Sequence, residues 1–169
     1  MSNGEAIRIE RAEGPTDDVH ALVGELDRAL GAEYPPEQRH GLAVDAIFQP
    51  HIRFFLARLG KAAVGCGGIA LFPDFAEVKR MYVRDVARGR GVAQTLLARL
   101  EAEARSAGLD VVRLETGDRQ FAAMRLYTRA GFQRRAVFGA YASMAPDRIA
   151  TSVFFEKQLA GSAAPSREE

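Results

Sequence analysis

The residues best suited to chemistry lie in one predicted strand–turn–helix segment near the middle of the chain. Its turn, residues 88–93, reads Arg-Gly-Arg-Gly-Val-Ala. Glycines before a helix N-terminus let the backbone approach a ligand, and the free amides there lie at the positive end of the helix dipole. Residues 79–90 also hold five basic side chains and one acidic side chain. The segment therefore indicates a site for a phosphate or pyrophosphate group, with an ordinary tight turn as the alternative.

Two common nucleotide-binding loops do not match this turn. A Walker A loop requires Gly-Lys-Ser or Gly-Lys-Thr, which the segment lacks. The Rossmann pattern requires a third small residue after Gly89 and Gly91, and Gln94 stands in that place. The sequence therefore disfavours binding of nucleoside triphosphates or NAD.

The hydrophobic pattern around the turn predicts the elements that position it. Alternating or short apolar runs predict strands at residues 6–11, 52–59, 62–72, 76–83, 111–115 and 152–157. Apolar residues at helical spacing predict helices at residues 15–30, 92–107 and 119–130. Residues 31–50 are expected to be irregular, with one further short helix. No repeat or change in composition separates these elements, so a single mixed α/β domain is predicted.

Composition limits the class of protein. A chain of 169 residues with 47% hydrophobic and 27% charged residues suits one globular domain with a core. The single cysteine excludes an internal disulfide framework and, with an N-terminus that lacks an apolar signal core, favours a cytoplasmic protein. The longest apolar run, residues 62–72, is too short and too rich in glycine to cross a bilayer.

The formal net charge of +1 argues against a nucleic-acid binder that relies on an overall basic surface. The charges are nevertheless segregated along the chain. Residues 1–50 carry 4 basic and 10 acidic side chains, whereas residues 51–135 carry 16 basic and 8 acidic ones. The acidic part favours a cationic acceptor such as a polyamine, an amino acid or a peptide N-terminus, and a solvated surface explains it equally well.

Two blocks of sequence together resemble a known family. The pattern R-x-x-G-x-A at residues 88–93, after the strand EVKRMYV, is similar to the acetyl-CoA motif of the GCN5-related N-acetyltransferase (GNAT) family. The block at residues 114–134, with L-Y-x-x-x-G-F at residues 126–132, resembles the family's next strand and helix. The resemblance implies an α/β (α+β) fold, with one GNAT-type domain over residues 5–159. Its mixed, mostly antiparallel central sheet would be flanked by helices and splayed at the fourth strand, and residues 160–169 would form a flexible tail.

The resemblance also assigns roles in binding acetyl-CoA. The amides of the turn would hold the pyrophosphate, and the splayed strand would pair with pantetheine, since an open strand edge offers unpaired amides and carbonyls. Gln120 stands where the family often has asparagine, and its side-chain amide would also bond pantetheine. The cofactor-binding residues expected on this basis are Met81, Tyr82, Val83, Arg88, Gly89, Arg90, Gly91, Val92, Ala93, Gln94 and Gln120.

Direct attack by an amine in a ternary complex needs a base and an acid. An amine with a pKa of about 10.4 is neutral in about one molecule in a few thousand at pH 7, so a base assists greatly. Glu77 is the candidate base, because strand alternation places it on the same face as Met81; a surface carboxylate paired with Lys79 or Arg80 is the alternative. Tyr127 is the candidate acid, because a phenol can donate to a departing thiolate; a core aromatic is the alternative.

Other reactive side chains are interpreted as structural. Cys66 lies among glycines in an apolar strand and is expected to be a small buried residue. His20, His40 and His51 lack metal-ligand spacing, and no metal is predicted. Arg84 and the outer arginines are candidates for meeting the 3′-phosphate of CoA.

Three functions fit these residues. The expected one is an acetyl-CoA-dependent N-acetyltransferase acting on the primary amine of a small molecule. The alternatives are a protein or peptide N-acetyltransferase and a non-catalytic CoA-binding sensor module. Neither nucleic acid nor a membrane is expected as a partner, and a homodimer is left open. The family's layout places the acceptor between residues 27–50 and 136–150, with four aromatic residues as expected lining: Tyr34, Phe54, Phe138 and Tyr141.

Overall fold

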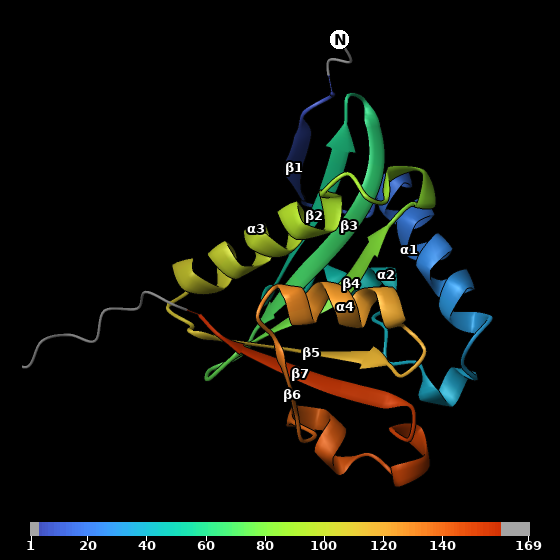
Figure 1. Cartoon of the computed structure of the whole chain (residues 1–169), viewed down its shortest axis with the longest axis vertical. Helices are drawn as coiled ribbons and strands as arrows, with labels where there is room; N and C mark the ends of the chain where they lie inside the picture. The colour runs from blue at the N-terminus through green and yellow to red at the C-terminus, as the bar shows by residue number, and fades with distance from the viewer. Residues whose placement is uncertain (1–3, 160–169) are drawn as a thin grey trace, which may run out of the picture.

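One sheet organises the computed structural model, which describes residues 4–159. Seven strands of this part of the chain pair in the order β1-β2-β3-β4-β5-β7-β6 (Figure 1). Neighbouring strands there are antiparallel except β4 and β5, which are parallel. The bounds are β1 Ile7–Ala12, β2 Ile52–Leu59, β3 Ala62–Leu71, β4 Ala76–Val83, β5 Val111–Gly117, β6 Gln133–Arg135 and β7 Ser152–Gln158. The predicted mixed, mostly antiparallel sheet is confirmed.

Helices cover both faces of this sheet (Figure 1). Helices α3 (Val92–Ser106) and α4 (Phe121–Arg129) lie on one face, and α1 (Asp17–Gly31) and α2 (Val44–Ile47) lie on the other. Short 3-10 helices connect them, namely η1 Pro36–Gln38, η2 Asp85–Ala87, η3 Gly139–Ser143 and η4 Pro146–Arg148.

Local chemistry explains where α1 begins and which side of it is buried. The hydroxyl of Thr16 accepts a hydrogen bond from the amide of Val19 at 3.4 Å. Asp17 and Asp18 occupy the first turn, where carboxylates complement the helix dipole. The apolar side of the helix is almost fully buried against the sheet, through Val19, Leu22 and Val23.

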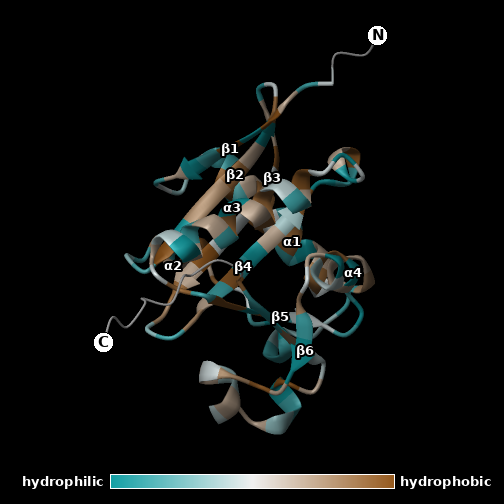
Figure 2. Ribbon diagram, turned by 60° about the vertical axis from the view of Figure 1, so that its left-hand side comes forward, coloured by the Kyte–Doolittle hydropathy of each residue, from teal (hydrophilic) through white to brown (hydrophobic). Residues whose placement is uncertain are grey.

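The sheet separates two apolar clusters. The larger one joins α3 and α4 to the sheet and includes Leu96, Leu100, Leu114 and Phe155. The smaller one lies beneath α1 and α2 and includes Cys66 of β3. Strands β2 and β3 are buried on both faces and are correspondingly hydrophobic (Figure 2).

Strand β4 departs from regular geometry in two ways that create room for a site. It pairs with β5 only at Ala76 and Glu77, and the two strands then diverge (Figure 1). A β-bulge also shifts its register with β3, and Arg80 within this bulge has φ +57°, a left-handed conformation that is uncommon outside glycine. The predicted splaying of the fourth strand is confirmed.

The sequence predicted most elements but misplaced some ends. The helix expected at residues 119–130 begins at Phe121, and the strand expected at residues 111–115 extends to Gly117. The sequence missed β6, whose three residues are too few for an alternating pattern. The tail predicted at residues 160–169 lies outside the described residues. Within residues 4–159, no helix is long and apolar enough to cross a membrane.

Candidate active site

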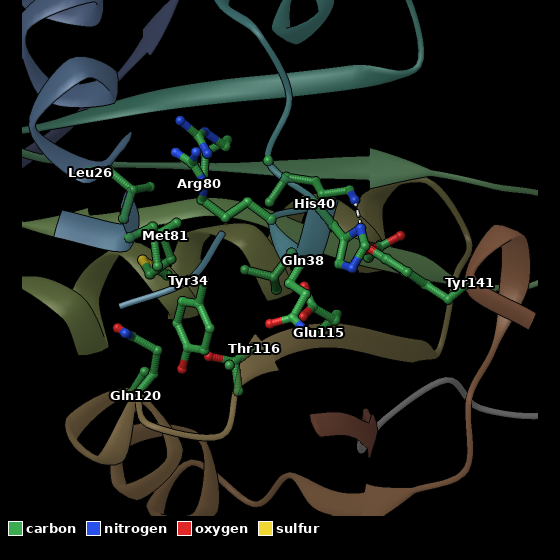
Figure 3. A pocket seen from close by; sticks show the side chains of 18 of the residues that line it. Leu26, Tyr34, Gln38, His40, Arg80, Met81, Glu115, Thr116, Gln120 and Tyr141 are labelled. Atoms are coloured by element: carbon green, nitrogen blue, oxygen red, sulfur yellow. Dashed lines mark hydrogen bonds and ion pairs between the residues drawn. The ribbon is translucent and has the colours of Figure 1, made fainter. Parts of the chain in front are cut away.

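A pocket opens where β4 and β5 diverge. It encloses about 800 Å³ of empty space, including its open mouth. Its walls come from both faces of the sheet, because Met81 and Tyr127 belong to the cluster under α3 and α4, whereas Leu26 and Tyr34 come from α1 and the segment after it. Figure 3 shows Met81 and Gln120 toward one end of the pocket. His40 and Tyr141 lie toward the other end, so the gap in the sheet connects two differently lined regions.

The glycine turn next to β4 presents unpaired backbone amides. Gly89 and Gly91 have φ +75° and +85°, a conformation that strongly favours glycine. The amide of Arg88 donates to the carbonyl of Asp85 at 3.2 Å. Within the described residues, the amides of residues 89–94 donate to no backbone carbonyl. Six successive amides at the start of α3 can therefore hold an anion such as a pyrophosphate.

Part of the basic cluster near this turn is already engaged. Arg84 donates to both carboxylate oxygens of Glu25, with distances of 3.0 and 2.7 Å. Arg88 forms an exposed ion pair with Asp85 at 3.0 Å. Arg90 is exposed and forms no ion pair with any residue between 4 and 159. Arg90 is thus more available to a phosphate than Arg84, which Glu25 holds.

The bulge in β4 reverses the expected arrangement of its side chains. Met81 and Val83 pack in the cluster under α3, whereas Tyr82 packs in the cluster under α1. Glu77 shares the face of Tyr82, because both pair with residues on one face of β3. The prediction that Glu77 and Met81 share a face is therefore wrong. The extra residue at Arg80 shifts the alternation by one position.

Glu77 belongs to a tight polar triangle. Its Oε2 accepts a hydrogen bond from the Tyr141 hydroxyl at 2.7 Å and lies 2.9 Å from Lys79 Nζ. Lys79 Nζ also donates to the Tyr141 hydroxyl at 2.8 Å. Burial, followed by the charge of Glu77, raises the pKa of Tyr141, which keeps the phenol protonated as a donor. The alternative pairing of Glu77 with Lys79 is thus present, whereas Arg80 pairs with Asp27.

Glu115 is a second pocket carboxylate, which the sequence did not single out. It lies on β5 opposite Phe154 and lines the pocket (Figure 3). Burial raises the pKa of Glu115 above its usual value. Among residues 4–159 it has no ion-pair partner. The signal available in the sequence was a single acidic residue directly after buried Leu114, which also fits an ordinary strand end.

Tyr127 is both a packed core residue and part of the pocket wall. Its ring lies 5.7 Å from that of Phe132 and 6.3 Å from that of Phe155, and 5% of the residue is exposed. Burial, and to a lesser extent the charge of Glu115, raises the pKa of the Tyr127 phenol. Its hydroxyl forms no hydrogen bond with the rest of residues 4–159. The hydroxyl is therefore free to donate to a bound molecule.

Gln120 and Tyr34 complete the wall near α4. Gln120 precedes the first residue of α4 and lines the pocket. The Tyr34 hydroxyl accepts a hydrogen bond from the amide of Arg119 at 2.8 Å. A side chain at Gly117 would overlap the Tyr34 hydroxyl, so glycine is required for this approach.

Comparison with known proteins identifies the family. The model of the acetyltransferase (GNAT) family matches residues 20–132. The chain belongs to the GNAT family. It is 43% identical over 155 residues to a protein of Azospirillum brasilense named IAA acetyltransferase, covering 90% of this chain and 98% of that protein.

Solved structures of other GNAT proteins share this fold. A provisionally named acyl-CoA N-acyltransferase from Klebsiella pneumoniae is 36% identical, with a TM-score of 0.72 over 92% of this chain and 99% of that one. The Salmonella typhimurium protein YncA, solved with acetyl-CoA, is 20% identical and resembles this chain in fold, with a TM-score of 0.66 over 96% of this chain and 99% of that one. The expectation of an N-acetyltransferase with a GNAT fold is confirmed.

The structure of this GNAT domain also shows where several other residues named in the sequence analysis lie. Tyr34 and Tyr141 line the pocket, as expected, whereas Phe54 packs beneath α1 and Phe138 packs beside Tyr141 behind the wall. Cys66 is fully buried, and burial raises the pKa of its thiol to about 12. Its interpretation as a small core residue is confirmed.

Proposed function

We propose that this N-acetyltransferase moves an acetyl group from acetyl-CoA to the primary amine of a small molecule, by direct attack in a ternary complex. The pocket beside β4 carries the proposal, because it brings Tyr127 together with the carboxylates of Glu77 and Glu115. The turn with the unpaired amides follows β4 along the chain. A walled pocket favours a small acceptor over a protein chain. The name of the Azospirillum relative, IAA acetyltransferase, also supports a small molecule.

The residues around the turn fit the cofactor. Acetyl-CoA supplies an acetyl group activated as a thioester. The open space in front of Gly89 and the unpaired amides of residues 89–94 suit its pyrophosphate. The backbone of Met81, Tyr82 and Val83 lies beyond the last β4–β5 pair, so this strand edge can bond pantetheine, with the Gln120 amide nearby in the pocket wall.

A pocket carboxylate then removes the proton that the protonated amine carries. Both Glu77 and Glu115 line the pocket. Glu77, the candidate from the sequence, already pairs with Lys79 and accepts a hydrogen bond from Tyr141, both through its Oε2. Glu115 lacks an ion pair within residues 4–159, and burial raises its pKa, which makes it the better proton acceptor near neutral pH. We therefore assign the base to Glu115 and give Glu77 the task of fixing Tyr141.

The Tyr127 hydroxyl stabilises the departing thiolate. The amine nitrogen bonds to the acetyl carbon, the carbon–sulfur bond breaks, and the sulfur takes a proton or a hydrogen bond from the Tyr127 hydroxyl. The second amine proton leaves when the amide forms, so the products are an acetamide, CoA and one released proton. A phenol whose pKa is raised donates a hydrogen bond more readily than a full proton, so we expect Tyr127 to act mainly as a donor of hydrogen bonds.

Two measurements test this function. Release of free thiol from acetyl-CoA across a panel of amines should be stimulated by some of them; no stimulation by any amine, together with tight CoA binding, would favour a non-catalytic binding module. Gly91→Glu should abolish CoA binding, because it places a carboxylate and a side chain at the anion site. Gly108→Glu is the matched control, since Gly108 has φ +79° with open space around it, at the opposite end of α3. Equal CoA affinity of the two variants would refute the assignment of the turn.

A further inference from the structure

The charged side chains that line the pocket pair off almost completely. Lys79 pairs with Glu77, and Arg80 pairs with Asp27 of α1. Two charged side chains of opposite sign are left in the wall, Arg39 and Glu115, with His40 and Lys79 near enough to Glu115 to act on its charge. Neither Arg39 nor Glu115 forms an ion pair within residues 4–159. An unpaired charge in a partly enclosed pocket is costly unless water or a ligand compensates it.

The residues on either side of Arg39 are held in place, whereas its guanidinium has no ion-pair partner within residues 4–159. The neighbouring residues are tied to η4, because Gln38 Nε2 donates to the carbonyl of Asp147 at 3.2 Å and His40 Nε2 lies 2.8 Å from the carbonyl of Arg148. The Nε of Arg39 is buried and has no hydrogen-bond partner in the described part of the chain. A guanidinium in a pocket wall with unpaired donors is suited to an anionic group, above all a planar carboxylate.

Glu115 lies among groups that belong to the reaction. It lines the same pocket as Tyr127 and Tyr141, and its charge contributes to the raised pKa of both phenols. A protonated amine placed against Glu115 would therefore lie in the pocket that Tyr127 lines. The acceptor can therefore place a negative group against Arg39 and a positive group against Glu115.

We infer that the acceptor is a zwitterion: a small molecule with a primary amine that faces Glu115 and a carboxylate or similar anionic group that faces Arg39. The inference rests on the proposed function and adds the substrate class. It makes Arg39 a specificity-determining residue. It also disfavours polyamines, because their additional ammonium groups would meet Arg39 and find no second free carboxylate in the wall.

The acidic residues near the N-terminus do not contradict this inference, because they face other partners. Glu10 and Asp18 pair with Arg58, and Glu25 pairs with Arg84. None of these three carboxylates lines the pocket. These three carboxylates thus serve contacts within the domain rather than attraction of a cationic acceptor.

The experiment compares matched pairs of acceptors with the purified full chain. Thiol release is measured with amino acids and with their carboxamides, which keep the amine and remove the negative charge; aminoalkylphosphonates form a third arm that separates carboxylate from phosphonate recognition. We expect kcat/KM to be at least about tenfold higher for the anionic member of the best pair, since hydrogen bonds to charged groups contribute on that scale.

The variant Arg39→Gln tests whether Arg39 causes the preference for the anionic acceptor. It should lower kcat/KM for the anionic acceptor by about tenfold to a hundredfold and leave kcat/KM for the matched carboxamide within about twofold. The carboxamide rate also reports folding, because a misfolded variant would lose both rates. Arg105→Gln, an exposed arginine at the end of α3, is the control and should change neither rate.

Three results would overturn the inference. Equal rates with amino acids and carboxamides would remove the role of the anionic group, and a wild-type preference that persists in Arg39→Gln would remove the role of Arg39. A preference for diamines would contradict the zwitterion directly. In each case the enzyme still acetylates amines, so the proposed function stands; absence of thiol release with every acceptor would refute that function itself.

Discussion

Replacement of Tyr127 by phenylalanine tests the chemistry of the pocket most directly. The change removes one hydroxyl and keeps the ring, which packs against Phe132 and Phe155 with 5% of the residue exposed. Since the hydroxyl has no hydrogen-bond partner within residues 4–159, its loss breaks no contact inside this part of the fold. We expect the free energy of unfolding to change by less than about 0.5 kcal/mol.

The effect on the reaction should be much larger than the effect on stability. Burial and the charge of Glu115 raise the pKa of this phenol, so it stays protonated over the usual assay range. A hydrogen bond from a neutral donor to a thiolate belongs to the charge-assisted class and contributes about 1.5–3 kcal/mol. At about 1.4 kcal/mol for each tenfold change, kcat should fall by about tenfold to a hundredfold or slightly more. KM for acetyl-CoA should stay within about twofold.

The assay follows thiol release at saturating amine, with thermal unfolding measured on the same preparations. Phe132→Leu is the control, because it disturbs the packing of the same ring and leaves the hydroxyl in place. That variant should lose about 1 kcal/mol or more of stability with a smaller loss of kcat. If Tyr127→Phe turns over at the wild-type rate, the role of this hydroxyl as donor is wrong.

Three further outcomes follow from the geometry. In urea denaturation, the free energy of unfolding of Arg80→Gly should exceed that of Arg80→Ala by about 1 kcal/mol. Both variants lose the guanidinium, but alanine also strains the left-handed backbone at φ +57°. Gly117→Ala should cost about 1–3 kcal/mol and reduce amine acetylation, because the new Cβ displaces Tyr34 from the pocket wall. Hydrogen bonding to Arg84 lowers the pKa of Glu25 below 4.5, so its ionised form adds stability at neutral pH that is lost as pH falls below about 4.5; chemical denaturation at pH 3–7 should show a smaller loss in Glu25→Gln.

The elements of the fold could be predicted wherever one physical signal dominated. Helix α1 combined a capping threonine, acidic residues in its first turn and a regular apolar face, and its predicted extent, residues 15–30, lies within two residues of Asp17–Gly31 at either end. Strand β6, at Gln133–Arg135, carries no such signal, because its charged and polar side chains lie beside β7 with little burial. Its position depends on pairing with a distant strand.

The site residues also separate into those with a local signal in the sequence and those without one. The conformation of the glycine turn could be predicted, because glycines before a helix are a local feature of the sequence, and Gly89 and Gly91 do have positive φ. Its role in binding acetyl-CoA stays a prediction. Glu115 and Arg39 are 76 positions apart in the numbering of the chain. They line the same pocket only once the whole domain has folded. Whether either charge is left without an ion-pair partner depends on all of its neighbours in the folded domain. No local pattern at either residue contains that information.

The bulge at Arg80 changes which pocket carboxylate is the better candidate for the base. Alternation along β4 placed Glu77 beside Met81 and made it the natural base. With the bulge, Met81 turns toward α3, and Glu77 stays on the α1 face, where Lys79 and Tyr141 hold it. Because Oε2 of Glu77 is engaged by these two groups, we assign deprotonation of the amine to Glu115, which lines the same pocket and forms no ion pair within residues 4–159. A comparison of Glu115→Gln with Glu77→Gln decides between the two: loss of the base should cost most near neutral pH and progressively less as rising pH deprotonates the amine in solution, whereas loss of a positioning group should cost the same at every pH.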